Sequence, residues 1–234
     1  MTALLTALTL TQALVVLADG RPGEAQAALE HLDDCVSLGA AQLDNLRDPR
    51  VAERTLRGAS SSWRSHLLIG IALAKEVPGA FVLRKLSLAG EVQRELTLAA
   101  ALGPRQVAAH EALFGFFLHA PGFAGGGRDK ARAEAEVLAK LDTFAGLLAQ
   151  AQLDGDYRLA ASEARTSEQI AALARISKDP ARFAAALEAR PQDARLRRDL
   201  SEILAELGQT GRSRHMLAEA CQIDPLYESA CHPR

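Results

Sequence analysis

The stretch PQDARLRRDLSEILAELGQTGRSRHMLAEACQIDP, from Pro191 to Pro225, predicts two short amphipathic helices joined by a glycine turn. Gly208 ends the first helix, because glycine adopts the left-handed conformation without a Cβ clash. Pro225 ends the second, since the residue before a proline is disfavoured in the helical region. The two prolines are 34 residues apart, the length of a known class of helical repeat. The apolar stripe of the first helix comprises Leu196, Leu200, Ile203, Leu204 and Leu207.

This unit resembles the tetratricopeptide repeat family. Arg197 stands where the family usually has an aromatic residue, and Ser213 where it usually has alanine. The resemblance implies an all-α fold, a right-handed superhelical solenoid of antiparallel helix pairs. The residues that carry it are Leu200, Leu204, Gly208, Leu217, Ala220 and Pro225.

The composition agrees with a helical fold. The chain has 234 residues, of which 48% are hydrophobic and only 4% aromatic, so small side chains fill the space between helices. Such a composition disfavours a sheet. The formal net charge of −2 gives no general basicity that would attract nucleic acid.

The three cysteines are too few and too scattered for a disulfide framework, and their odd number leaves at least one thiol free. A single bridge between Cys221 and Cys231 is conceivable. With so few cysteines, however, we expect reduced thiols. Cys35 is expected to be a small buried apolar residue.

The segment TALLTALTLTQALVVLA, residues 2–18, has two interpretations. It ends in Val16-Leu17-Ala18, which resembles a signal-peptide cleavage site, and export would place the protein in the periplasm. Alternatively it is the first helix of a repeat, followed by a turn at Gly20-Arg21-Pro22 and a second helix over residues 24–32. We favour this second interpretation and a cytoplasmic location, since no Lys or Arg precedes the apolar run. The segment is too short and too rich in threonine to span a membrane.

The rest of the chain predicts further helix pairs in one domain, residues 1–234. Residues 33–62 are loose, with one helix near 49–56, and a long helix over 81–102 follows the break at Pro78-Gly79. About five units exceed the roughly three that a stable stack needs. They lie near residues 9–32, 63–104, 105–142, 143–177 and 192–225.

A glycine-rich loop separates the helices expected at 107–119 and 131–141. Its sequence PGFAGGG resembles a P-G-aliphatic-x-G-G insertion of some bacterial tetratricopeptide proteins, with Phe123 in place of the aliphatic residue. We expect a wide turn that folds Phe123 back onto Phe114, Phe116 or Phe117. The alternative is an anion or small-ligand site at Gly125, Gly126, Gly127 and Arg128. A phosphate loop, however, needs lysine and a hydroxyl residue after a strand.

No catalytic motif occurs in the sequence, and no two histidines have the spacing that places two metal ligands on one helix face. We therefore predict no enzymatic activity, no metal and no cofactor. The predicted function is that of an adaptor, which binds an unidentified peptide or protein in its concave groove as a monomer or weak homo-oligomer. A self-assembling scaffold is the alternative.

The predicted groove residues lie on the first helices of the pairs. Arg195 and Arg198 are one turn apart and could together hold a carboxylate. The full set is Glu111, His119, Gln152, Arg195, Arg198 and Glu202.

Overall fold

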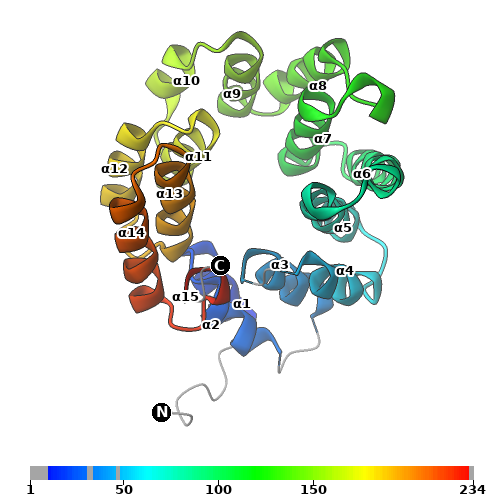
Figure 1. Cartoon of the computed structure of the whole chain (residues 1–234). Coiled ribbons are helices and arrows are strands. Elements are labelled where there is room, and N and C mark those ends of the chain that lie inside the picture. The colour runs from blue at the N-terminus through cyan, green and yellow to red at the C-terminus, as the bar shows by residue number, and fades with distance from the viewer. Residues whose placement is uncertain (1–9, 31–33, 46–47, 232–234) are drawn as a thin grey trace. The chain divides into compact units, whose positions relative to one another are not determined.

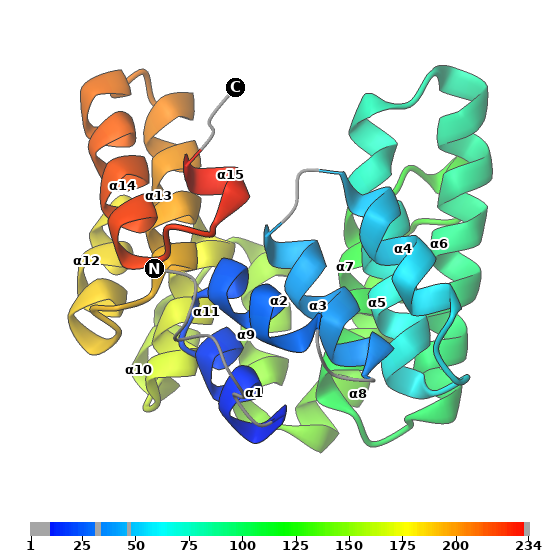
Figure 2. The same cartoon turned by 90° about the horizontal axis from the view of Figure 1, so that it is seen from below.

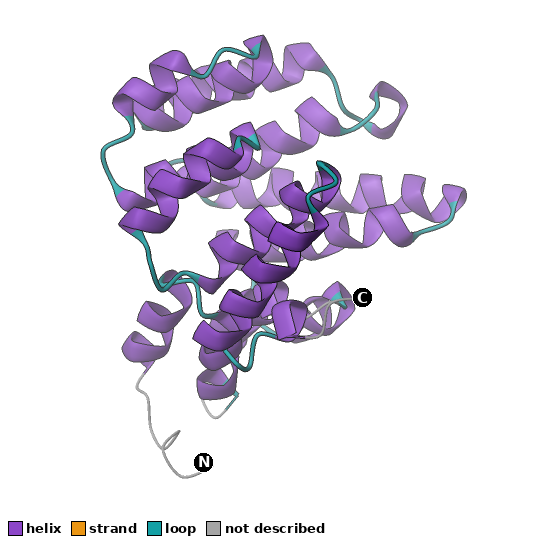
Figure 3. Cartoon of the chain, turned by 60° about the vertical axis from the view of Figure 1, so that its left-hand side comes forward, coloured by secondary structure: helices purple, strands orange, loops and turns teal. Residues whose placement is uncertain are grey.

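The computed structural model describes residues 10–30, 34–45 and 48–231 (Figure 1). Within these ranges the chain is helical and contains no strand, and within each of its two parts successive helices pack against each other (Figure 3). The all-α prediction is therefore confirmed. The chain divides into two compact units. We call Pro49–Ala164 the central unit, and Met1–Asp48 with Arg165–Arg234 the terminal unit.

The central unit begins with α4, which agrees with the helix predicted near 49–56. Ser62 then starts α5 by accepting the Ser65 backbone N–H at 3.1 Å, and the Ser65 hydroxyl accepts the Ser62 N–H in return. The helices are α4 (Pro49–Arg57), α5 (Trp63–Glu76), α6 (Val82–Leu102), α7 (Val107–His119), α8 (Arg128–Leu141), α9 (Thr143–Asp154) and α10 (Arg158–Glu163), with short 3-10 turns η1 (Val77–Gly79) and η2 (Gly122–Ala124).

Small residues let these helices approach closely. At the α8–α9 crossing, a Cβ added to Gly146 would lie 2.5 Å from Ala139 Cα, so only glycine fits there. Alanines fill most of the neighbouring core. The buried cluster of α7, α8 and α9 is Phe114, Ala131, Ala135, Leu138, Ala145, Ala149 and Leu153.

The terminal unit contains the helix pair predicted from Pro191 to Pro225. Gly208 has φ +73° and ends α13, as its sequence position predicted. Phe183 of α12 is fully buried against Leu196 and Leu204. The helices are α1 (Leu10–Ala18), α2 (Pro22–Leu29), α3 (Cys35–Asn45), α11 (Ser167–Ser177), α12 (Pro180–Ala189), α13 (Ala194–Glu206), α14 (Thr210–Ile223) and α15 (Glu228–Cys231).

The first helices of the chain form a packed group. Ala13 and Val16 of α1 are buried against Ala25 and Leu29 of α2, so residues 10–18 form a helix that packs on α2. Residues 2–9 of that segment lie outside the described residues. Helix α3 occupies part of the range predicted to be loose, because tertiary packing on α2 stabilises it.

The expectation of reduced thiols at the C-terminal end is wrong. Cys221 of α14 and Cys231 of α15 form a disulfide, with their Cα atoms 4.9 Å apart. The turn at Asp224 folds the chain back and brings the two residues together. Cys35 is a free thiol, but the expectation that it is buried is wrong, since its side chain is partly exposed. None of the described helices is both long and apolar enough to cross a bilayer.

Candidate functional site

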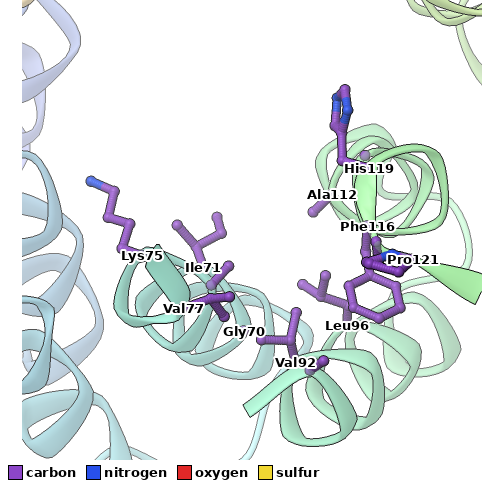
Figure 4. A pocket seen from close by; sticks show the side chains of 14 residues that line it. Gly70, Ile71, Lys75, Val77, Val92, Leu96, Ala112, Phe116, His119 and Pro121 are labelled. Carbon is purple, nitrogen blue, oxygen red and sulfur yellow. The ribbon is translucent and has the colours of Figure 1, made fainter. Parts of the chain in front are cut away.

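An open apolar pocket lies in the central unit, between α5, α6 and α7 (Figure 4). Its volume is about 500 Å³, within the range typical of ligand sites. Apolar side chains form most of its wall. The lining residues are Gly70, Ile71, Ala74, Lys75, Val77, Ala89, Val92, Leu96, Ala112, Gly115, Phe116, His119, Ala120 and Pro121.

The pocket exists because small residues line it where larger ones would fill it. On α5, a Cβ added to Gly70 would lie 2.6 Å from Leu96 Cδ2, so this glycine lets α5 and α6 pack closely at the pocket floor. On α7, by contrast, a Cβ at Gly115 would meet nothing within 4 Å. Phe116 forms a wall and packs edge-on against Phe117, with ring centroids 5.8 Å apart.

Two basic side chains stand at the opening. Lys75 of α5 and His119 of α7 point away from the apolar floor, toward the open side (Figure 4). Both are exposed. Among the described residues that line the pocket there is no carboxylate. The pocket therefore suits an apolar group that carries an acidic group beside it.

The predicted groove residues of the central unit are only partly brought together. His119 lines the pocket, whereas Glu111, on the same helix, does not. Desolvation and the nearby charge of Asp142 raise the pKa of Glu111. Gln152 lies on α9, where its amide N–H donates to the Leu148 carbonyl at 3.4 Å.

The other predicted groove residues lie on α13 of the terminal unit, where they form ion pairs. Arg195 donates to Asp44 of α3 at 2.7 Å. Arg198 lies 2.6 Å from Asp199 and 3.0 Å from Glu202. Burial tends to lower the pKa of Arg195, but the charges of Asp44 and its neighbours outweigh this and raise it. Arg195 thus links α3 to α13 within the fold.

The glycine-rich loop is a wide turn whose glycine N–H groups are already bonded. Gly125, Gly126 and Gly127 donate to the carbonyls of Gly122, Pro121 and Phe117 at 3.1, 3.1 and 2.8 Å, respectively. Arg128 donates to the Leu153 carbonyl, and the Lys130 amine donates to the Gly125 carbonyl at 2.8 Å. The glycine N–H groups and Lys130 thus stabilise the turn itself, whereas Arg128 joins it to α9.

The expected packing of Phe123 is wrong, since its side chain is 83% exposed. Gly125 has φ +96°, and this left-handed residue turns the chain so that the preceding η2 segment faces solvent. The Lys130 amine lies 5.5 Å from the centre of the Phe117 ring and covers it instead.

Two histidine–glutamate pairs were not foreseen from the sequence. His66 Nδ1 lies 2.6 Å from Glu95 Oε2 and joins α5 to α6, while His110 Nδ1 lies 2.9 Å from Glu134 Oε2 and joins α7 to α8. The partners are 29 and 24 residues apart, so no local motif signals them. The described part of the chain contains no group of three or more potential metal ligands.

No protein-family model matches the chain, and no curated protein matches it in sequence. Apart from His119, the pocket residues were not predicted as a site, because Ile71, Val92 and Phe116 have the spacing of ordinary core positions. A helical apolar stripe predicts burial but does not indicate whether a neighbouring helix covers it. The function proposed below is therefore argued from the shape of the pocket and from the residues that line it.

Proposed function

We propose that this chain is a non-enzymatic, tetratricopeptide-like adaptor that binds a peptide segment of a partner protein. The unit from Pro191 to Pro225 and the pairwise packing of successive helices support the family resemblance. A right-handed superhelical solenoid is the arrangement that this resemblance implies.

The pocket between α5, α6 and α7 is the observation that carries the proposal. Its volume of about 500 Å³ accommodates one or two large apolar side chains. Lys75 and His119 favour an acidic residue beside them. The expected partner segment therefore presents a bulky apolar residue next to Asp or Glu.

A pocket-filling substitution tests this proposal. Peptides are first selected from a random library on the full chain, and their affinities are then measured by fluorescence polarisation. Gly115→Leu fills the pocket from an open position and should weaken the selected peptides at least about tenfold. Gly90→Leu is the matched control, since Gly90 is an exposed glycine of α6, also open at its Cβ position, that does not line the pocket.

Reversing the charge at the pocket opening provides a second test of the proposal. Lys75→Glu should weaken acidic peptides more than their amide analogues, because it replaces an attraction by a repulsion. If no peptides are enriched, or if they bind the Gly115→Leu and Gly90→Leu variants equally well, the pocket is not the binding site. Circular dichroism confirms that each variant retains its helix content.

The two alternatives have different support. An anion site at Gly125–Gly127 would need free N–H donors, and the internal hydrogen bonds of the loop use them. We therefore do not propose it. A self-assembling scaffold has some support from apolar side chains exposed near the start of α6. Light scattering over a range of protein concentrations tests it directly.

A further inference from the structure

The start of α6 carries an unusual group of exposed apolar side chains. We call residues 81–86, which comprise Phe81 and the first turns of α6, the α6 tip. Phe81, Val82 and Leu83 are 72%, 74% and 74% exposed, and Leu86 is 43% exposed. Single exposed apolar residues are ordinary on protein surfaces, whereas such a contiguous group marks an interaction site.

The tip is exposed because α6 continues beyond its packing partners. The first buried residue of α6 is Leu88, so the helix from Val82 to Ser87 precedes the core. Figure 2 shows the turn between α5 and α6 at one end of the central unit.

The charge of the tip has one sign. Between Val77 and Gly90, Arg84 and Lys85 are the charged residues, and both are basic. The flanking acidic residues are Glu76, which pairs with Arg50 at 3.1 Å, and Glu91, which pairs with Arg84 at 3.0 Å. Lys85 is exposed beside the apolar side chains. The tip therefore combines apolar side chains with an adjacent basic group.

The shape of the tip favours a soft partner over a flat protein face. Successive side chains of a helix point about 100° apart, so Val82 and Leu83 leave the helix in different directions. A rigid surface could cover one of these directions, whereas the interfacial region of a lipid layer can surround several. The basic residues are complementary to anionic headgroups. The pocket of a second copy is a poorer match, since Lys75 at its opening has the same sign of charge.

We propose that the α6 tip inserts peripherally into the surface of a membrane that contains anionic lipid. Phe81, Val82 and Leu83 would enter the boundary between headgroups and acyl chains, and Lys85 would contact the headgroup phosphates. This mode of attachment is independent of the pocket and needs no membrane-spanning helix.

Vesicle sedimentation with the full chain tests the proposal. We expect the protein to bind vesicles of phosphatidylglycerol mixed with phosphatidylcholine, and to bind pure phosphatidylcholine much more weakly. Phe81→Ser combined with Leu83→Gln should reduce the partition coefficient at least roughly tenfold, since two large apolar side chains no longer enter the lipid. The fold should be unaffected, because both side chains are exposed.

Matched control variants distinguish insertion of the α6 tip from nonspecific adsorption of exposed apolar or basic side chains. Phe123→Ser combined with Leu159→Gln removes two equally exposed apolar side chains of the same unit, 83% and 69% exposed, and should leave binding unchanged. Lys85→Glu should weaken binding to anionic vesicles, whereas Lys140→Glu, an exposed lysine of α8, should have a smaller effect.

Two outcomes would overturn the proposal. One is the absence of binding to anionic vesicles by the wild-type chain. The other is binding that the tip double variant and the Phe123/Leu159 control reduce equally. If the tip variant instead abolishes self-association in light scattering while vesicles are not bound, the tip contacts a second copy of the chain. Peptide binding at the pocket is measured without vesicles, so the two proposals fail separately.

Discussion

The carboxylate of Asp224 accepts a hydrogen bond from the backbone N–H of Gly23 at 2.8 Å, across 201 positions of sequence. The same carboxylate accepts the N–H of Glu24 at 3.2 Å, and Asp224 is fully buried. An acidic residue from the C-terminal part of the terminal unit thus caps the first turn of α2, where N–H groups lack partners within the helix. The start of α2 and the turn between α14 and α15 are held together at this point.

Replacing this carboxylate should destabilise the terminal unit. Asp224→Ala is expected to lower the free energy of unfolding by about 2–3 kcal/mol, because it leaves two N–H groups of α2 without their acceptor. Asp224→Asn should cost less, since its amide oxygen still accepts and burial already raises the pKa of Asp224. Urea unfolding measures both changes. Equal stability of Asp224→Ala and the wild type would show that the cap is not needed.

A methyl group at Gly23 should have a similar effect for a steric reason. A Cβ there would lie 2.5 Å from the Tyr227 backbone nitrogen and still closer to the Leu226 carbonyl group. Gly23→Ala is therefore expected to destabilise the protein by at least about 1–3 kcal/mol. Gly211→Ala of α14 is the control, since its Cβ meets nothing and it should stabilise the helix by about 0.5–1 kcal/mol. Thermal unfolding tests this, because Tm should fall for Gly23→Ala and rise for Gly211→Ala.

The disulfide should stabilise the same region. Cys221 and Cys231 are ten positions apart and enclose Asp224 and Tyr227, which pack against the start of α2 and against α13. Cys231→Ser, or reduction, is expected to lower the free energy of unfolding by about 2–3 kcal/mol. Alkylation of the unreduced, denatured chain followed by mass spectrometry should label Cys35 alone. Labelling of all three cysteines before reduction would contradict the disulfide.

A double-mutant cycle tests whether Arg195 serves the fold. Its guanidinium lies 2.7 Å from Asp44 Oδ2, and the two side chains are 24% and 27% exposed. Because this ion pair is partly shielded from solvent, we expect a coupling of about 1 kcal/mol between Asp44→Asn and Arg195→Gln. Additive effects, within about 0.3 kcal/mol, would mean that Arg195 does not depend on Asp44.

The pair of His66 and Glu95 should make stability depend on pH. Burial alone would raise the pKa of Glu95, but hydrogen bonds from His66 and Arg94 outweigh it and hold the pKa below 4.5. A carboxyl whose pKa is lower in the folded state stabilises the fold above its unfolded pKa, and this contribution is lost as pH falls through the folded pKa. The wild type should thus lose stability on acidification below about pH 4.5.

Glu95→Gln should remove part of this dependence. At neutral pH it is expected to lower the free energy of unfolding by about 1–2 kcal/mol, and the difference from wild type should shrink toward about pH 3. Tm measured from about pH 3 to 7 gives both results. Glu136→Gln, at an exposed position of α8, serves as the control. A constant difference across this pH range would mean that the Glu95 charge does not contribute.

Several elements of this fold followed from local sequence. Residues 107–119 were predicted as a helix and form α7 with the same bounds. The break at Pro78-Gly79 and the turn at Gly208 also lie at the positions that proline and glycine predicted. These signals are local because they depend on the backbone preferences of single residues and on apolar spacing within one helix. Helix α3, in contrast, depends on packing against α2 and was not predicted.

The candidate site followed much less from sequence. Of the predicted groove residues, His119 lines the pocket, whereas Arg195 and Arg198 take part in ion pairs of the fold. Spacing predicts which residues share a helix face but not which helix, if any, covers that face.

The sequence by itself determined that the chain folds into helices, where many of them end, and that small residues separate them. Tertiary structure alone decided that Asp224 caps α2, that Cys221 meets Cys231, and that α5, α6 and α7 leave an apolar pocket open. The reason is physical: helix formation depends on neighbours within about four residues. Caps, bridges and cavities depend on distances between segments that may be 200 residues apart, and these distances are fixed when the helices pack.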